Sequence, residues 1–151
     1  MASEVSDSGL FHDKKHISTV FDTLNKQRLS PKLCDVILQI FDFQIYAHSC
    51  VLAAASPYFE VLFHEDTSRV FSPKSPQLIE IQIDGQSDFA YKTAVDKIVN
   101  FMYTCEIQLD NEKVAHILEI SRIMQMHSII STVLYLVCIY VQHFYVIEMK
   151  T

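Results

Sequence analysis

The sequence contains very little glycine. Its 151 residues include two glycines, Gly9 and Gly85, four prolines and no tryptophan. Phosphate-binding loops of the dinucleotide and P-loop types need several closely spaced glycines, so both are excluded. The same scarcity excludes collagen-like and low-complexity chains. Because 50% of the residues are apolar, the chain has enough material for the core of one globular domain.

An excess of basic residues is also absent. Twelve Lys and Arg residues stand against eighteen Asp and Glu residues, which gives a formal charge of −6. The densest basic pair is Lys14-Lys15, whereas binding to a phosphate backbone needs clustered cations. We therefore expect no direct contact between this segment and nucleic acid.

The four cysteines are widely spaced and form no CxxC pair. Cys34, Cys50, Cys105 and Cys138 each have apolar sequence neighbours, which predicts small buried thiols in a reducing compartment. The N-terminal residues lack the apolar stretch of a signal peptide. A nuclear or cytoplasmic location is therefore expected.

Catalytic signatures are missing as well. The seven histidines are scattered without an HExxH pattern. Ser56 lies in AASPY rather than in the GxSxG turn of a hydrolase nucleophile. No arrangement supplies a nucleophile, a base and an orienting group together. The sequence therefore predicts a non-enzymatic protein without a metal site or cofactor.

The first half of the chain combines helical and extended patterns. Ile17, Val20, Phe21 and Leu24 follow the spacing of an amphipathic helix, which Ser30-Pro31 should end. The further elements predicted here are a hairpin over 36–47, a short helix over 48–55, a second short helix that Ser56-Pro57 begins, a loop over 64–77 and a strand over 78–83.

The second half is predicted to be helical. Helices are expected over 88–103, over 110–124 with Asp110 as N-cap, and from residue 127 onward. Residues 104–109 are open to a short strand. Strands in the first half and helices in the second indicate an α+β domain.

Residues 129–147 form an almost unbroken apolar run. Three interpretations stay open for it. The run approaches the length of a membrane anchor, or it is a core helix that also presents apolar surface to a partner. An extended segment is the third, because β-branched and aromatic residues are frequent after Val137. We favour the helix, since Gln142 and His143 interrupt the run and the preceding helical pattern leads directly into it.

Three stretches together resemble the BTB/POZ domain. They are CDVILQI from Cys34, YAHSCVLAAASPYFEVLF from Tyr46 and FMYTCEIQLDNEKVAHILEISRIMQM from Phe101. The resemblance implies an α+β fold in which a helical cluster is flanked by a small β-sheet of about three strands. It covers residues 13–135, which leaves a flexible N-terminus over 1–12 and an atypical apolar tail over 136–151.

The resemblance also implies an intertwined homodimer. Its interface would be built largely from the helix that carries Ile17, Val20, Phe21 and Leu24, because self-association buries an apolar stripe that otherwise faces water. Pairing with other BTB proteins is a further option.

A charged pocket is another property that the resemblance implies. In the family, an Asp at the position of Asp35 faces a basic residue directly after the position of His48. Ser49 stands there instead, so corepressor docking that depends on an Asp–basic pair is less expected. We interpret His48 as a hydrogen-bonded core or cap histidine rather than as a metal ligand or a base.

Two functional classes follow from the resemblance. In the first, the domain dimerises and recruits corepressors for a zinc-finger transcription regulator. In the alternative, it is a substrate adaptor that binds the cullin scaffold of a cullin-RING E3 ubiquitin ligase, with Phe63 and Glu65 as candidate cullin contacts. The usual discriminators, zinc fingers or Kelch repeats, do not occur within the 151 residues.

Overall fold

The computed structural model describes residues 4–5, 9–84, 89–110 and 113–148, and side-chain environments for 9–84, 89–110 and 113–140. The described elements are β1 (Glu4–Val5), β2 (Phe11–His12), α1 (His16–Leu29), β3 (Val36–Ile40), β4 (Phe43–Ala47), α2 (Ser49–Ala55), α3 (Pro57–Glu65), β5 (Gln77–Glu80), α4 (Phe89–Thr104), α5 (Val114–Ile123) and α6 (His127–Glu148).

A three-stranded mixed sheet has the order β4-β3-β5. Strands β3 and β4 form an antiparallel hairpin in which Val36 pairs with Ala47, and β5 pairs with β3 in parallel. Val36, Leu38 and Ile40 alternate with less buried residues, so one face of the central strand lies in the core. The predicted α+β class with about three core strands is confirmed.

The helices complete one continuous core with the sheet. Helix α4 packs against α1, α2 and α5, and its buried face consists of Ala94, Val95, Ile98, Val99, Met102 and Tyr103. Each fully buried aliphatic side chain contributes about 1.5–3 kcal/mol relative to exposure. This central position of α4 explains why the two halves of the chain form one domain.

Ser56 links the two halves directly. Its side chain accepts a hydrogen bond from the Phe59 N–H at the start of α3, as the predicted N-cap should. Its hydroxyl also donates to the Met124 carbonyl, 2.6 Å away at the end of α5.

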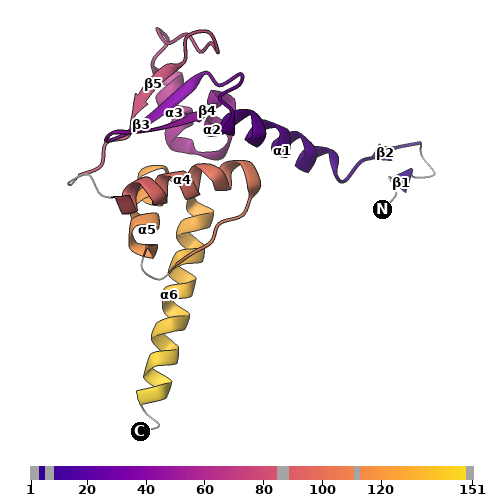
Figure 1. Ribbon diagram of the computed structural model, residues 1–151. Helices are drawn as coiled ribbons and strands as arrows, with labels where there is room; N and C mark the ends of the chain where they lie inside the picture. The colour runs from indigo at the N-terminus through magenta and orange to yellow at the C-terminus, as the bar shows by residue number, and fades with distance from the viewer. Residues whose placement is uncertain (1–3, 6–8, 85–88, 111–112, 149–151) are drawn as a thin grey trace.

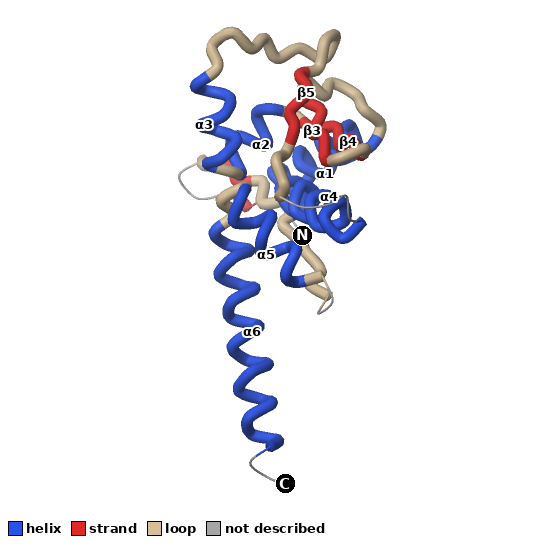
Figure 2. Tube along the Cα trace, turned by 90° about the vertical axis from the view of Figure 1, so that its left-hand side faces the viewer, coloured by secondary structure: helices blue, strands red, loops and turns tan. Residues whose placement is uncertain are grey.

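Two parts of the molecule reach out from this core. The N-terminal end of α1, with the paired strands β1 and β2, extends to one side, and α6 extends away from the sheet (Figure 1). The view from the side shows α6 continuing well beyond α5 (Figure 2). Among the described residues, no helix is long and apolar enough to cross a membrane.

Some predicted elements differ from the structure. The extended interpretation of residues after Val137 is wrong, because α6 runs through them to Glu148. Residues 104–109 contain no strand, and β5 ends at Glu80 rather than at Ile83. The pairing of β1 with β2 was not predicted. The predicted start of the fourth helix at residue 88 lies outside the described residues.

Asp110 is not the N-cap of α5. The helix begins at Val114 after Lys113, because the Asp110 carbonyl first accepts the Lys113 N–H in a turn. The Asp110 carboxylate lies 2.7 Å from Nζ of Lys97 instead, and this hydrogen bond holds the pKa of the carboxyl below its usual range.

The prediction of four buried thiols is wrong for three of them. Cys34 is buried, whereas Cys50, Cys105 and Cys138 are exposed, and none forms a disulfide. Apolar sequence neighbours do not bury a helical residue, since adjacent helical positions point in different directions. Cys50 lies in the first turn of α2 and Cys138 on the projecting α6.

Candidate functional site

Helix α1 presents part of its apolar stripe to solvent. Ile17 is 70% exposed and Val20 is 42% exposed, whereas Phe21 and Leu24 are half-buried against the core. The four residues predicted as one interface therefore divide into an outer pair and an inner pair. The outer pair is available to a partner, and the inner pair also anchors the helix.

A hollow of about 450 Å³ continues this apolar surface between α1 and the end of α4. Its apolar lining includes Ile17 and Phe21 from α1 and Met102 from α4. A second molecule that covered α1 would also cover this hollow.

Arg28 fixes the other end of α1. It is only 5% exposed, and its guanidinium donates to the side-chain oxygens of Asn25 and Asn100. It also lies over the Tyr103 ring, 5.1 Å from the centroid, where a cation–π attraction adds to the hydrogen bonds. Because α1 is held at its C-terminal end, its N-terminal half stands out from the body (Figure 1).

Two of the predicted charged-pocket residues, Asp35 and Ser49, do come together, but as a hydrogen-bonded pair rather than an ion pair. The Ser49 N–H donates to Oδ1 of Asp35 at 2.7 Å, and the Ser49 hydroxyl donates to Oδ2 at 2.6 Å. The carboxylate thus caps the start of α2, where the helix dipole also favours negative charge. In the described part of the chain, Asp35 forms no ion pair with a basic side chain.

His48 lies beneath this pair in a buried polar cluster. Its Nδ1 lies 3.0 Å from Oη of Tyr103, which also accepts the His48 N–H, and its Nε2 lies 3.9 Å from Sγ of Cys34. Burial raises the pKa of the Cys34 thiol, Asp35 raises it further and Arg28 opposes this. Burial likewise raises the pKa of Tyr103. The Cys34 thiol and the Tyr103 phenol are thus both held in their neutral forms, which suits structural roles better than nucleophilic ones.

The sequence did not reveal Tyr103 or Arg28 as members of this cluster. Tyr103 is the last residue of the helix predicted over 88–103, but the partner of its hydroxyl, His48, lies 55 positions away in the sequence. A buried arginine has no sequence signal at all, since arginine is usually exposed.

The two candidate cullin contacts, Phe63 and Glu65, lie in different environments. Phe63 is half-buried between Phe59 and Phe71, with ring centroids at 5.6 and 4.9 Å. Glu65, the last residue of α3, is exposed. A shallow depression of about 620 Å³ follows the outer face of α3, and it is lined by Glu60, Val61, His64 and Glu65. Glu65 is therefore available to a partner, whereas Phe63 mainly supports the helix.

Within residues whose side chains are placed, no group of three or more His, Cys, Asp or Glu residues has the geometry to hold a metal ion. The described surface instead exposes apolar side chains on α1 and α6, among them Ile17, Leu134 and Tyr135, and two glutamates on α3, Glu60 and Glu65. These features suit contacts with proteins.

Comparisons with known proteins support the same interpretation. The family model of the BTB/POZ domain matches residues 24–138. Kelch-like protein 36 from Rattus norvegicus is 32% identical over 128 residues, which are 84% of this chain and 19% of that protein. Zinc finger and BTB domain-containing protein 14 from Homo sapiens is 34% identical over 110 residues, which are 73% of this chain and 22% of that protein. The chain thus spans about a fifth of the length of these curated relatives.

A solved structure has the same fold. The BTB domain of zebrafish PATZ1 superposes with a TM-score of 0.70 at 25% sequence identity. The match covers 85% of this chain and 96% of that domain. The likeness therefore extends over the sheet, the helical cluster and most of the chain.

Proposed function

The chain belongs to the BTB/POZ domain family, a family of non-catalytic interaction modules that typically dimerise, and we propose that it forms a homodimer through the outer face of α1. The main support for this proposal is that Ile17 and Val20 are exposed beside the apolar hollow that Phe21 and Met102 line. Large apolar side chains on one helix face gain free energy when a partner removes them from water. Pairing with other BTB proteins would use the same face.

Sedimentation velocity tests the homodimer. We expect the wild type to sediment as a dimer and Ile17→Asp plus Val20→Asp to sediment as a monomer, because the two carboxylates would be desolvated in the interface. These outer positions are better probes than Phe21 and Leu24, whose substitution would also damage the core. Val70→Asp is the matched control, since Val70 is 72% exposed on a loop.

Two results would overturn the homodimer. One is a monomeric wild type at micromolar concentrations. The other is a double variant that remains dimeric while it keeps the circular-dichroism spectrum of the wild type.

For the role of this dimer, we propose recruitment of corepressors in a zinc-finger transcription regulator of the nucleus. Relatives that support this role include zinc finger and BTB domain-containing protein 14. The pairing of Asp35 with Ser49 supplies a specific test, because Ser49→Arg would provide the missing cation. We expect this variant to bind a corepressor fragment more tightly than the wild type, as measured by calorimetry. Equal or weaker binding would show that the pocket is not the docking site.

The alternative function is that of a cullin-RING substrate adaptor in the cytoplasm or nucleus. Its support is the exposed Glu65 at the end of α3 and the similarity to Kelch-like protein 36. A pull-down with a cullin N-terminal domain tests it. Glu65→Lys should weaken capture, whereas Glu106→Lys, which changes another exposed glutamate, should not. No capture by the wild type would remove this alternative.

A further inference from the structure

Every proline in this chain follows a serine. The four pairs are Ser30-Pro31, Ser56-Pro57, Ser72-Pro73 and Ser75-Pro76. A serine followed by proline is the minimal substrate of proline-directed Ser/Thr protein kinases, which accept a following residue whose ring nitrogen carries no N–H. The sequence alone does not separate the four serines, but the structure places them in different environments.

Two of the serines are parts of helix ends. Ser56 is 1% exposed and its hydroxyl donates to the Met124 carbonyl, so a kinase would reach it only after the domain opened. Ser30 is exposed at the C-cap of α1, but its hydroxyl and its N–H both donate to the Lys26 carbonyl. Phosphorylation of either serine requires hydrogen bonds to break first.

The other two serines lie in the loop between α3 and β5. Ser72 is half-buried, and its hydroxyl accepts the Lys74 N–H at 3.3 Å. Ser75 ends the same turn with its N–H donating to the Ser72 carbonyl, and its side chain is exposed. Within the described residues, the Ser75 hydroxyl has no hydrogen-bond partner. Ser75 is thus the only one of the four whose hydroxyl is both exposed and unengaged in the described structure.

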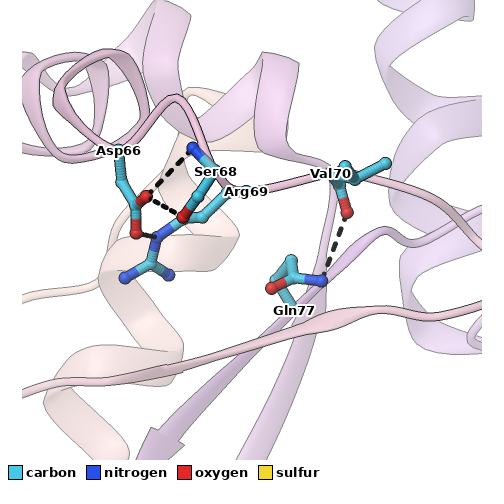
Figure 3. A network of polar contacts seen from close by, with 5 residues as sticks. All are labelled: Asp66, Ser68, Arg69, Val70 and Gln77. Carbon is cyan, nitrogen blue, oxygen red and sulfur yellow. Dashed lines mark hydrogen bonds and ion pairs between the residues drawn. The ribbon is translucent and has the colours of Figure 1, made fainter.

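Hydrogen bonds fix the two segments of the loop on either side of this serine (Figure 3). In one segment, Asp66 accepts hydrogen bonds from the backbone and hydroxyl of Ser68 and from Nε of Arg69. In the other segment, Nε2 of Gln77 donates to the Val70 carbonyl at 3.2 Å. The turn from Ser72 to Ser75 lies between these hydrogen-bonded residues.

We propose that Ser75 is a phosphorylation site for a proline-directed Ser/Thr protein kinase. The Ser75 hydroxyl oxygen attacks the γ-phosphorus of ATP, and a new P–O bond forms. The bond from the γ-phosphorus to the bridging oxygen breaks, ADP leaves with that electron pair, and the hydroxyl proton passes to the base of the kinase.

The phosphate would add a charge of about −1.5 to −2 to the loop. Lys74 is exposed directly beside it, and no buried group needs to move, so the fold should tolerate the modification. The change would affect what binds near the loop rather than the stability of the domain. This inference rests on the loop alone and does not depend on the proposed dimer.

The test incubates the full chain with a recombinant proline-directed Ser/Thr kinase and Mg-ATP under native conditions, and maps the phosphate by mass spectrometry. We expect Ser75 to be the first residue that is phosphorylated. Ser75→Ala should reduce the initial rate at least about fivefold, because the remaining serines need local opening. Pro76→Ala should reduce it similarly. Ser30→Ala, the matched exposed control, should stay within about twofold of the wild type.

A denatured sample provides the second comparison. In urea-unfolded chain diluted briefly into the assay, Ser56 should also accept phosphate, which shows that burial protects it in the native state. The proposal is overturned if the native chain accepts no phosphate, if Ser30 or Ser72 is modified first, or if Ser75→Ala is phosphorylated at the rate of the wild type.

Discussion

At the scale of single residues, Ser56 combines two bonds that hold separate parts of the chain. Its side chain caps α3 and its hydroxyl reaches the Met124 carbonyl. Ser56→Ala removes both bonds and leaves a buried carbonyl without its donor, so we expect the free energy of unfolding to fall by about 1–3 kcal/mol. Urea unfolding followed by circular dichroism measures this. Ser75→Ala, on the exposed loop, is the control and should unfold like the wild type.

A second residue-scale prediction concerns alkaline pH. Burial raises the pKa of both Cys34 and Tyr103, so the unfolded chain loses these protons at lower pH than the folded chain does. The two protonated groups therefore stabilise the fold fully at pH values below the pKa that each has in the unfolded chain, about 8.5 for Cys and about 10 for Tyr. This stabilisation is lost as the pH rises above those pKa values towards the higher pKa values of the folded chain. We expect the free energy of unfolding to decline across this range.

The variant Tyr103→Phe separates the contribution of Tyr103 to this pH dependence from that of Cys34. The variant removes the phenol that titrates last, so its unfolding free energy should fall less steeply than that of the wild type above about pH 10. Parallel curves for the two proteins would show that Tyr103 does not titrate differently in the folded and unfolded states.

Residue patterns predicted some of these environments and missed others. Ser56-Pro57 predicted the start of a helix, because the residue preferences at the N-cap and at the first helical position depend only on neighbouring residues in the sequence. The buried contacts of Arg28, Tyr103 and His48 depend on chain segments that are far apart in sequence. Local patterns contain no information on such pairings, and for this reason the polar cluster beside Asp35 could not be derived.

At the scale of elements, strong periodicity was the best guide. Helix α1 follows from an apolar spacing typical of an amphipathic helix, and the β3–β4 hairpin was predicted although both of its faces carry apolar residues. The ends of elements were less predictable, as α5 shows. Asp110 is a good N-cap residue in isolation, but its carboxylate binds Lys97 from α4 instead. A tertiary contact thus occupies the carboxylate that the local pattern assigned to the helix N-cap.

The connection between α1 and β3 contains a strained residue. Leu33 has a φ of 58°, which places its backbone in the left-handed region, where the Cβ clashes with the chain. Because the residue is 63% exposed, its side chain gains little packing that would offset this strain. We expect Leu33→Gly to raise the free energy of unfolding by about 0.5–1 kcal/mol, since glycine adopts this conformation without a steric cost. The measurement is urea unfolding.

Leu33→Ala is the matched control for this strain. Alanine keeps the Cβ, so it should not gain the stability that glycine gains. If Leu33→Gly were less stable than Leu33→Ala, the exposed part of the leucine side chain would contribute more than the strain costs.

At the scale of the whole molecule, the core and the exposed apolar surfaces lie in different places. The sheet and α2 to α5 close a single core, while the N-terminal half of α1 and the outer part of α6 extend from it (Figures 1 and 2). The resemblance of the sequence to a family predicted this core well, because a shared fold fixes the central elements. The helix predicted from residue 127 onward is α6, and it continues to Glu148 beyond this core.

The last prediction concerns the boundary of the folded unit at residue 135. Ile129 and Val133 are buried at the base of α6, whereas Val137, Ile139 and Tyr140 are exposed further along it. A chain ended after residue 135 should therefore lose less than about 1 kcal/mol of unfolding free energy, while Val133→Ala in the full chain should lose about 1–3 kcal/mol. Urea unfolding of the two proteins gives the comparison. The shortened chain should also aggregate less in light scattering, because exposed apolar helix surface favours association. If shortening were as destabilising as Val133→Ala, residues 136–148 would belong to the folded unit, and the boundary would have to move to the end of α6.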